Sequence, residues 1–330
     1  MATSISVREI VRHIPKQTPS SFHVRERFGK PQGTLRLSAA PFQLSILCYN
    51  LALLPWPAEY LGTNRDGAIA EVIARIKGDP PDVVGLCEVF VDDEREHIRE
   101  SLASLYPFSL SGPDLANPKQ DGGLLLMSRL SMVDSHSVVY DSGCAGSDCL
   151  ANKGFLHMRL AHPSSAVSLD VFFSHTQDLS AFPAPGEPGP PSDPREVLYS
   201  QLRSLFVAST LFSDPAGSHR FFFGDLNIPG EKPAHYGELI QRLDGPTDLW
   251  VAQGNPPASG FTNTQDNNFY QDPSDAPDAS SRLDYILMKP GPGAIPVAEN
   301  VDILKFSRSG RDISDHFGLR ARFELEARVQ

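Results

Sequence analysis

Residues 221–229, with the sequence FFFGDLNIP, constrain the fold of this chain more than any other stretch. Three consecutive phenylalanines after the polar pair His219-Arg220 predict a β-strand buried on both faces. Asp225 and Asn227 are two residues apart, so on extended chain both side chains project to the same side. The stretch predicts a carboxylate and an amide at the mouth of a hydrophobic core. The alternative is an ordinary turn at a strand end, where Asp and Asn are common.

Bulk composition limits the class of protein. The chain has 330 residues, enough for one large domain or two small ones, and 40% of them are hydrophobic. It carries 29 Lys and Arg against 40 Asp and Glu, a net charge of −11. Because proteins bind nucleic acid largely through Lys and Arg, this balance argues against a nucleic-acid partner.

The sequence shows neither a transmembrane segment nor a secretory signal. No apolar run approaches the roughly 20 residues of a transmembrane helix. The N-terminus lacks the basic-then-apolar pattern of a secretory signal. We therefore expect a cytoplasmic or peripheral-membrane location, with secretion left open.

Predicted strands and helices alternate along much of the chain. Apolar runs predict strands at 44–50, 83–88, 124–129, 154–160, 167–174 and 283–289, and within 313–325 an alternating strand follows Ser314-Asp315-His316. Helical periodicity occurs at 66–77, 92–107, 235–243 and in a stretch that begins at Pro194 with Asp193 as its cap. Alternation of this kind is typical of α/β proteins. We find no internal repeat and no domain boundary after residue 43.

Three further segments leave alternatives open. Residues 7–14 predict a short amphipathic helix packed on the domain, with a targeting segment as the alternative. The Pro- and Gly-rich residues 180–194 predict an irregular loop, of a length typical of a lid, a binding loop or a linker. Residues 263–281 carry four aspartates but lack the spacing of a calcium loop, so we interpret them as a solvated loop.

The four cysteines fall into two pairs. Cys48 and Cys87 lie in apolar, strand-like runs and are predicted to be buried thiols. Cys144 and Cys149 flank a loop of Gly and Asp and could form a disulfide. Two isolated cysteines define neither a disulfide framework nor a zinc site, so the sequence leaves their pairing and the redox compartment open.

Polar side chains lie at the ends of six predicted strands. They are Asn50, Glu88, His175, Asp225 with Asn227, Asp284, and Asp315 with His316. Each alone has a structural explanation, such as a turn residue or a hydrogen-bonded histidine. It is harder to explain in this way why strands spread over most of the chain each end in an acid, an amide or an imidazole. Because strand ends converge on one rim in layered α/β architectures, we expect these side chains to meet at one site.

The residue types in this set favour one chemistry. Carboxylates and amides are oxygen ligands suited to Mg²⁺, which keeps several waters and is completed by substrate phosphate. Mn²⁺ and Co²⁺ are alternatives, and Ca²⁺ is not expected to support catalysis. Two histidines near acids offer a general base and a donor to charge that develops on phosphate. Since the sequence has neither a P-loop nor a GxSxG motif, we predict metal-assisted attack of water on a phosphate ester.

Six short motifs carry a resemblance to a known superfamily. They are CYN ending at Asn50, CEVF around Glu88, SHTQ around His175, GDLN at 224–227, LDY at 283–285 and SDH at 314–316. In this order they resemble the endonuclease/exonuclease/phosphatase superfamily from about residue 44 to the C-terminus. The resemblance implies a deoxyribonuclease-like α/β fold, a four-layer α/β/β/α sandwich of two packed, mostly antiparallel β-sheets. It implies residues 1–43 as an N-terminal extension and residues 44–330 as the catalytic domain.

Within this superfamily the chain is most similar to the neutral sphingomyelinases. EVF at 88–90, GGLLLMSR at 122–129, GCAGSDCLANKGF at 143–155 and the His-x-Gln motif at 175–177 carry this resemblance. It implies a monomeric phosphodiesterase of the phospholipase C type, which cleaves sphingomyelin at a membrane surface into ceramide and phosphocholine. An endonuclease or a phosphoinositide phosphatase on the same fold is the alternative, because fold does not fix substrate.

The resemblance also implies which residues bind the metal and the headgroup. Glu88, with Asn50 close by, would hold the main Mg²⁺. Asp315 would support the site or a second metal. Lys153 would lie near the headgroup or brace its own loop, and both roles stay open.

Catalytic roles follow from the same resemblance. His316 would deprotonate the attacking water, and Asp284 would orient it. Asp225, Asn227 and His175 would position the phosphate or stabilise its transition state.

Two features depart from the secreted bacterial members. Those proteins carry an aromatic β-hairpin, used to enter the membrane, between the LDY and SDH positions. Here that interval, 290–312, is short, lacks Trp and contains only Phe306 as an aromatic residue. In some secreted relatives, the loop after the His motif contains a cysteine that would be a partner for Cys144. This chain lacks that cysteine and has the Pro-rich segment in its place. Both departures weaken the expectation that this protein attacks membranes in the same way.

Overall fold

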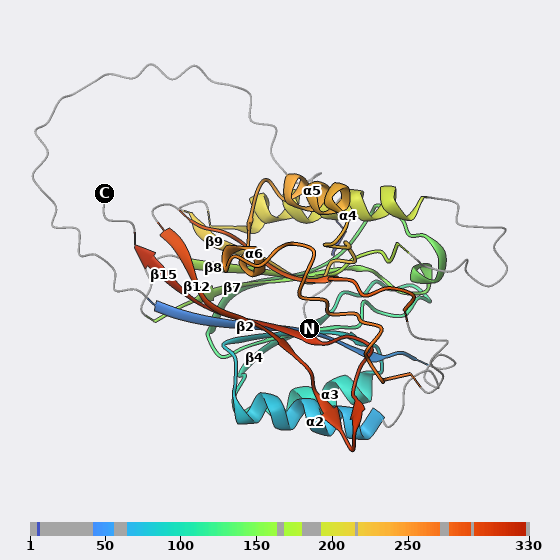
Figure 1. Ribbon diagram of the computed structural model, residues 1–330. Coiled ribbons are helices and arrows are strands. Elements are labelled where there is room, and N and C mark those ends of the chain that lie inside the picture. Colours follow the sequence, from blue (N-terminus) through green and yellow to red (C-terminus); the bar gives the residue numbers. More distant parts are fainter. Residues whose placement is uncertain are drawn as a thin grey trace, which may run out of the picture.

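The computed structural model describes residues 5–6, 42–55, 65–163, 168–179, 193–214, 217–270, 277–291 and 294–327. Figure 1 shows two β-sheets packed face to face, with helices on both outer faces. The prediction of a four-layer α/β/β/α sandwich is therefore confirmed. Within these ranges, no helix combines the length and the apolar composition needed to cross a membrane.

The larger sheet has seven strands, in the order β1-β6-β7-β8-β9-β11-β10. In that order their bounds are Ile5–Ser6, Ser131–Val139, Gly154–Ala161, Ser168–His175, Ser218–Asp225, Asp284–Lys289 and Thr247–Asp248. Helix α4 (Pro194–Phe212) connects β8 to β9, and this crossover makes the two strands parallel. Helix α5 (Pro233–Arg242) packs beside α4 on the outer face, and the short α6 (Leu249–Ala252) follows β10.

The smaller sheet has six strands, in the order β12-β15-β2-β3-β5-β4. In that order their bounds are Ala294–Leu304, Gly318–Ala327, Phe42–Leu53, Val83–Val89, Leu124–Ser128 and Phe108–Gly112. Helices α2 (Arg65–Gly78) and α3 (Asp92–Leu102) cover its outer face. A hairpin of β13 (Ser307–Arg308) and β14 (Arg311–Asp312) lies beside α2.

The three phenylalanines of β9 show why this strand is apolar on both faces. Phe221 and Phe223 lie in the core between the two sheets, where Phe221 packs against Phe323 of β15 with ring centroids 5.3 Å apart. Phe222 points the other way, into the layer between the larger sheet and α4, together with Leu202. Each buried phenylalanine contributes roughly 1.5–3 kcal/mol to folding. The strand therefore holds two layers of the sandwich together while its last residue, Asp225, reaches the rim.

Some elements differ from the sequence prediction. The predicted helix over 92–107 ends at Leu102, five residues before Pro107. The sequence pattern does not predict β4, β6, β12 or the hairpin, because their apolar residues are interrupted by polar ones. The predicted helix over 7–14 and most of the Pro-rich stretch, 180–192, lie outside the described residues.

Candidate active site

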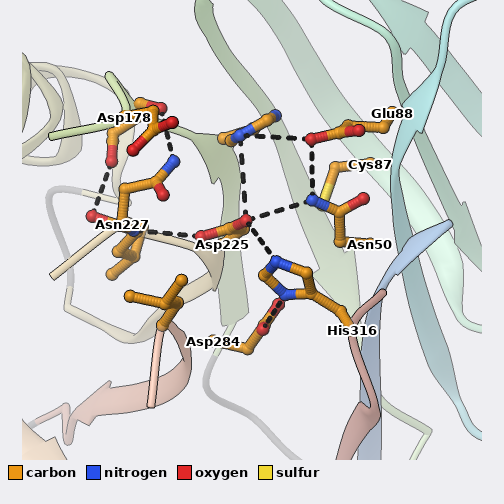
Figure 2. A network of polar contacts seen from close by, with 12 residues as sticks. Asn50, Cys87, Glu88, Asp178, Asp225, Asn227, Asp284 and His316 are labelled. Carbon is orange, nitrogen blue, oxygen red and sulfur yellow. Dashed lines mark hydrogen bonds and ion pairs between the residues drawn. The ribbon is translucent and has the colours of Figure 1, made fainter. Parts of the chain in front are cut away.

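The structure brings the ends of strands from both sheets to one rim (Figure 2). Asn50 of β2 is opposite Cys87 of β3. Glu88 is the next residue of β3, so it lies at the rim where these inner strands of the smaller sheet end. In the larger sheet, Asp225 of β9 and Asp284 of β11 are direct partners in an antiparallel pair. A single site is therefore lined by side chains that lie far apart in the sequence.

Asn50 links the two sheets at this site. Its Nδ2 donates to Glu88 Oε1 at 2.9 Å and to Asp225 Oδ2 at 3.1 Å. Its Oδ1 accepts from the backbone N–H of Ala52 at 3.0 Å, which fixes the orientation of the amide. Asn50 is 1% exposed, so this contact places two carboxylates around one buried amide.

Two site residues adopt a backbone conformation that is uncommon without glycine. Glu88 has φ +57° and Asn227 has φ +50°, both in the left-handed region. Such residues persist where the surrounding structure fixes them, and they cluster at functional sites. Asn227 is held by its N–H, which donates to Asp225 Oδ1 at 3.0 Å, and by its Nδ2, which donates to Thr176 O at 3.0 Å.

His316 is oriented by Asp284. Its Nδ1 donates to Asp284 Oδ2 at 2.8 Å, so the neutral ring carries its lone pair on Nε2, which is 3.7 Å from Asp225 Oδ2. Burial lowers the pKa of His316, but the charges of Asp284 and Asp225 outweigh it and raise that pKa well above its usual value. The other oxygen of Asp284, Oδ1, is buried and has no hydrogen-bond partner among the described residues.

His175 and Lys153 form the opposite side of the site. Lys153 Nζ donates to His175 Nε2 and to Thr176 O, both at 3.0 Å, and is 3.3 Å from Asp148 Oδ1. Burial, followed by the charges of Lys153 and His316, holds the pKa of His175 well below its usual value, so this imidazole is neutral. Lys153 thus has three partners within the protein. Because its ammonium is engaged with them, we expect it to act on the site through its positive charge.

Asp315 lies at the edge of the site beside Glu88. Its Oδ2 accepts from the hydroxyl of Tyr270 at 2.9 Å, and its Oδ1 is 3.3 Å from Ser314 Oγ. Burial first, and then the charge of Asp315, raise the pKa of Glu88 to about 7. Asp315 and Glu88 are therefore close enough to repel each other when both are ionised.

The residues present fit a divalent cation. Ligand atoms of Asp225, Asp284 and His316 all lie within 4.8 Å of one another, and all three residues are buried. Burial raises the pKa of Asp225, like that of Glu88, to about 7, so the folded protein gathers negative charge that water does not solvate. A bound cation would neutralise this charge and provide the partner that Asp284 Oδ1 lacks.

All the predicted site residues, Lys153 included, lie in this one region. The geometric cluster of Asp225, Asp284 and His316 differs from the predicted metal set, in which Glu88, Asn50 and Asp315 are the ligands. The two sets adjoin through the bond from Asn50 to Asp225. The assignment of Glu88, Asn50 and Asp315 as metal ligands therefore stays a prediction.

Sequence reasoning gives no role to two residues that contact the site. Asp148 pairs with Lys153, and Tyr270 holds Asp315. Asp148 lies within the motif at 143–155, five residues before Lys153, so the motif itself was the available signal. Tyr270 stands in a polar loop without periodicity, and no signal marks it.

A sandwich of two packed sheets, with buried carboxylates and histidines at one rim, is an architecture of hydrolases that act on phosphoric esters. Residues 48–316 match the Endonuclease/Exonuclease/phosphatase family, and the chain belongs to this family. The predicted superfamily is therefore confirmed.

Sphingomyelinases occur among the similar proteins. Sphingomyelinase C 2 of Leptospira interrogans is 21% identical over an aligned length of 290 residues, and the match covers 81% of this chain and 42% of that protein. The chain thus spans about two fifths of the length of this curated relative. The crystal structure of sphingomyelinase C from Streptomyces griseocarneus has a TM-score of 0.64 at 21% identity and covers 85% of this chain and 99% of its own.

Two further solved structures share the fold. A beta toxin mutant from Staphylococcus aureus with bound magnesium ions has a TM-score of 0.61 at 18% identity, covering 85% of this chain and 99% of its own. TDP2 of D. rerio, complexed with single-strand DNA product, has a TM-score of 0.61 at 17% identity, covering 85% and 98%. At these identities the structural likeness establishes the fold alone.

Proposed function

We propose that this protein is a Mg²⁺-dependent phosphodiesterase that hydrolyses sphingomyelin to ceramide and phosphocholine. The observation that carries the proposal is the Asp284-oriented His316, which faces Asp225 next to the bond between Asn50 and Glu88. The sphingomyelinases among the similar proteins and the EVF and Asn-Lys-Gly-Phe motifs support this substrate. The substrate would be met at a phospholipid surface by a monomer.

Glu88 and Asn50 would hold the main cation, with Asp315 beside them. When bound, Mg²⁺ supplies positive charge that polarises the phosphate ester and offsets the buried carboxylates. The raised pKa of Glu88 and of Asp225 agrees with a site arranged for such a charge.

His316 is the proposed general base. In the neutral ring Nδ1–H donates to Asp284, so the lone pair of Nε2 is directed into the site and can take a proton from water. A bound cation would offset the charges of Asp284 and Asp225 that raise the pKa of His316, and so would favour this neutral form. The water oxygen then forms a bond to phosphorus, and the bond from phosphorus to the ceramide oxygen breaks. Ceramide leaves as an alcohol. The proton that its oxygen gains equals the one that His316 took from water, so no net proton is lost or gained in these two steps. One water is consumed, and phosphocholine is the other product.

The remaining residues position the phosphate. Asp225 accepts hydrogen bonds from Asn50 and from the backbone of Asn227, so it fixes both amides. The neutral imidazole of His175 lies against the ammonium of Lys153, which brings positive charge to the side of the site where negative charge develops. These groups are in place before substrate binds, which is what electrostatic stabilisation requires.

A substrate panel tests the proposal. Purified protein with Mg²⁺ is incubated with sphingomyelin vesicles, plasmid DNA and an inositol polyphosphate, and phosphocholine, nicked DNA and phosphate are measured. We expect phosphocholine release that EDTA abolishes, that Mg²⁺ restores and that Ca²⁺ does not support. The second candidate is a nuclease, which the fold shared with TDP2 favours. Cleavage of DNA alone would replace the lipid assignment with that function.

A further inference from the structure

A disulfide closes a small loop at the border of the site. Cys144 and Cys149 are bonded, which answers the question that the sequence leaves open. The loop contains most of a short 3-10 helix, Gly146–Leu150, and it is tied to the segment after His175. The backbone N–H of Ala145 donates to Gln177 Oε1 at 2.8 Å, and Gln177 Nε2 donates to Ala145 O at 3.0 Å.

Asp148 lies inside this closed loop and connects it to the active site. Its Oδ2 accepts from the backbone N–H of Asp178 at 2.7 Å, and its Oδ1 is 3.3 Å from Lys153 Nζ. Lys153 in turn donates to His175 Nε2 at 3.0 Å. Two contacts, Asp148 to Lys153 and Lys153 to His175, thus lead from the disulfide loop to the imidazole that faces Asp225.

The positive charge of Lys153 reaches the catalytic carboxylates. Burial raises the pKa of Glu88 and of Asp225, and the charge of Lys153 opposes both shifts. Lys153 is 7% exposed, so this charge is poorly screened by water. Its position therefore affects the electrostatic potential where the phosphate would bind.

We infer that the Cys144–Cys149 disulfide is a redox-sensitive brace that positions Lys153 through Asp148. This inference rests on the proposed function for its effect on catalysis. Gly146 inside the loop and Gly143 next to it have positive φ, at +57° and +79°, so this segment gains much conformational freedom once its covalent closure is lost. Asp148 then no longer stays fixed against Lys153, and the ammonium is free to leave His175.

The reductant is a dithiol, and the disulfide that it attacks lies near exposed residues. Cys144 and Cys149 are half-buried, and their neighbours Gly143 and Leu150 are exposed, Leu150 by 58%. Lys119 Nζ is 3.9 Å from Cys144 Sγ and favours its departure as a thiolate. Attack at Cys149 breaks the S–S bond. The dithiol gives up two electrons and two protons to leave two cysteine thiols, and it becomes a disulfide itself.

Kinetics of the oxidised and dithiol-reduced protein on sphingomyelin vesicles test the brace. We expect kcat to fall about tenfold to a hundredfold on reduction, the size of a lost charged contact, with a much smaller change in KM. The Cys144→Ser/Cys149→Ser double variant should have the low kcat with or without the dithiol. Ser147→Ala, in the same loop, is the matched control and should respond as the wild type does. Equal kcat in the two states, with reduction confirmed by mass, would overturn the inference.

Two further measurements separate a positioning role from a merely structural one. Asp148→Asn should reproduce the loss of kcat in the oxidised protein, and Asp148→Glu should recover part of it. Labelling by an amine-reactive reagent, followed by mass spectrometry, should show Lys153 protected in the oxidised protein and modified several-fold faster after reduction. Unchanged protection would contradict the brace. This readout needs no substrate, so the brace can fail while the enzyme assignment stands, and the reverse.

Discussion

At the residue scale, the site depends on which atom of each side chain is already engaged. Asn50 uses its amide hydrogens on Glu88 and Asp225, and His316 uses Nδ1 on Asp284. What remains is an imidazole nitrogen facing a carboxylate and an oxygen of Asp284 without a partner among the described residues. These unused atoms are available to a water molecule or to a ligand that enters the site.

Replacing His316 tests its role as the base. His316→Ala should lower kcat by a factor on the order of 10²–10⁴ with folding intact, because the attacking water loses its proton acceptor. Steady-state kinetics measure the loss, and thermal unfolding checks the fold. His97→Ala, at an exposed histidine of α3, is the control and should keep the activity of the wild type. Activity near that of the wild type in His316→Ala would contradict the assignment.

Metal binding should stabilise the fold through Glu88. A ligand that binds only the folded state at 100 times its Kd raises the free energy of unfolding by about 2.7 kcal/mol. We therefore expect Mg²⁺ to raise the melting temperature of the wild type and EDTA to reverse the rise. In Glu88→Gln the same Mg²⁺ concentration should give a clearly smaller shift. Glu96→Gln on α3 is the control, and an equal shift in both variants would argue that Glu88 is not a ligand.

At the scale of elements, the pairing of β8 with β9 positions Asp225, and it requires a glycine. Gly224 has φ +127°, and a Cβ there would lie 2.0 Å from Ser174 O. Gly224→Ala should therefore destabilise the protein by more than about 2 kcal/mol and displace Asp225, with loss of activity. Gly237→Ala in α5 meets no atom within 4 Å and should stabilise the helix by about 0.5–1 kcal/mol. Urea unfolding of both variants measures the contrast, and a neutral Gly224→Ala would refute it.

Helices and strands with a clear pattern of apolar residues could be predicted from the sequence. Elements in which polar residues interrupt that pattern could not. β9 was predictable because both its faces are buried, which leaves an uninterrupted apolar run. β12 was not, because its sequence AIPVAENVDIL contains a proline and three polar or acidic residues. It is specified by its pairing with β15, a contact between segments that the local pattern does not encode.

The same limit applies to the site. Strand-end residues such as Asp225 and Glu88 could be identified because a polar group after an apolar run is visible in the sequence. The contact of Asp148 with Lys153 depends on how a disulfide-closed loop folds back on the sheet. Nothing in residue type or spacing fixed whether Cys144 and Cys149 pair, so the loop's connection to the site was visible only in three dimensions.

At the scale of the whole molecule, buried neutral histidines make the fold sensitive to acid. Burial lowers the pKa of His157, which stacks on Phe212 of α4, and lowers that of His219 in β9 to about 4. Neither residue lies in the site, so their effect concerns stability and not catalysis. In the unfolded chain both should titrate near their ordinary value of about 6.5. As the pH falls, protons therefore bind first to the unfolded state.

His219 allows this effect to be measured in isolation. It is 2% exposed, and its Nδ1 accepts from the N–H of Gly291 at 3.0 Å, so the folded state requires the neutral ring. The unfolded state binds more protons between pH 6.5 and 4, so stability falls with pH across this window, by up to about 2 kcal/mol between pH 7 and pH 5. His219→Asn keeps an acceptor for Gly291 but removes the titration. Urea unfolding should therefore show a smaller loss in this variant from pH 7 to pH 5, whatever its stability at pH 7. His97→Asn on the surface should follow the wild type, and parallel curves for all three proteins would show that His219 does not drive the acid sensitivity.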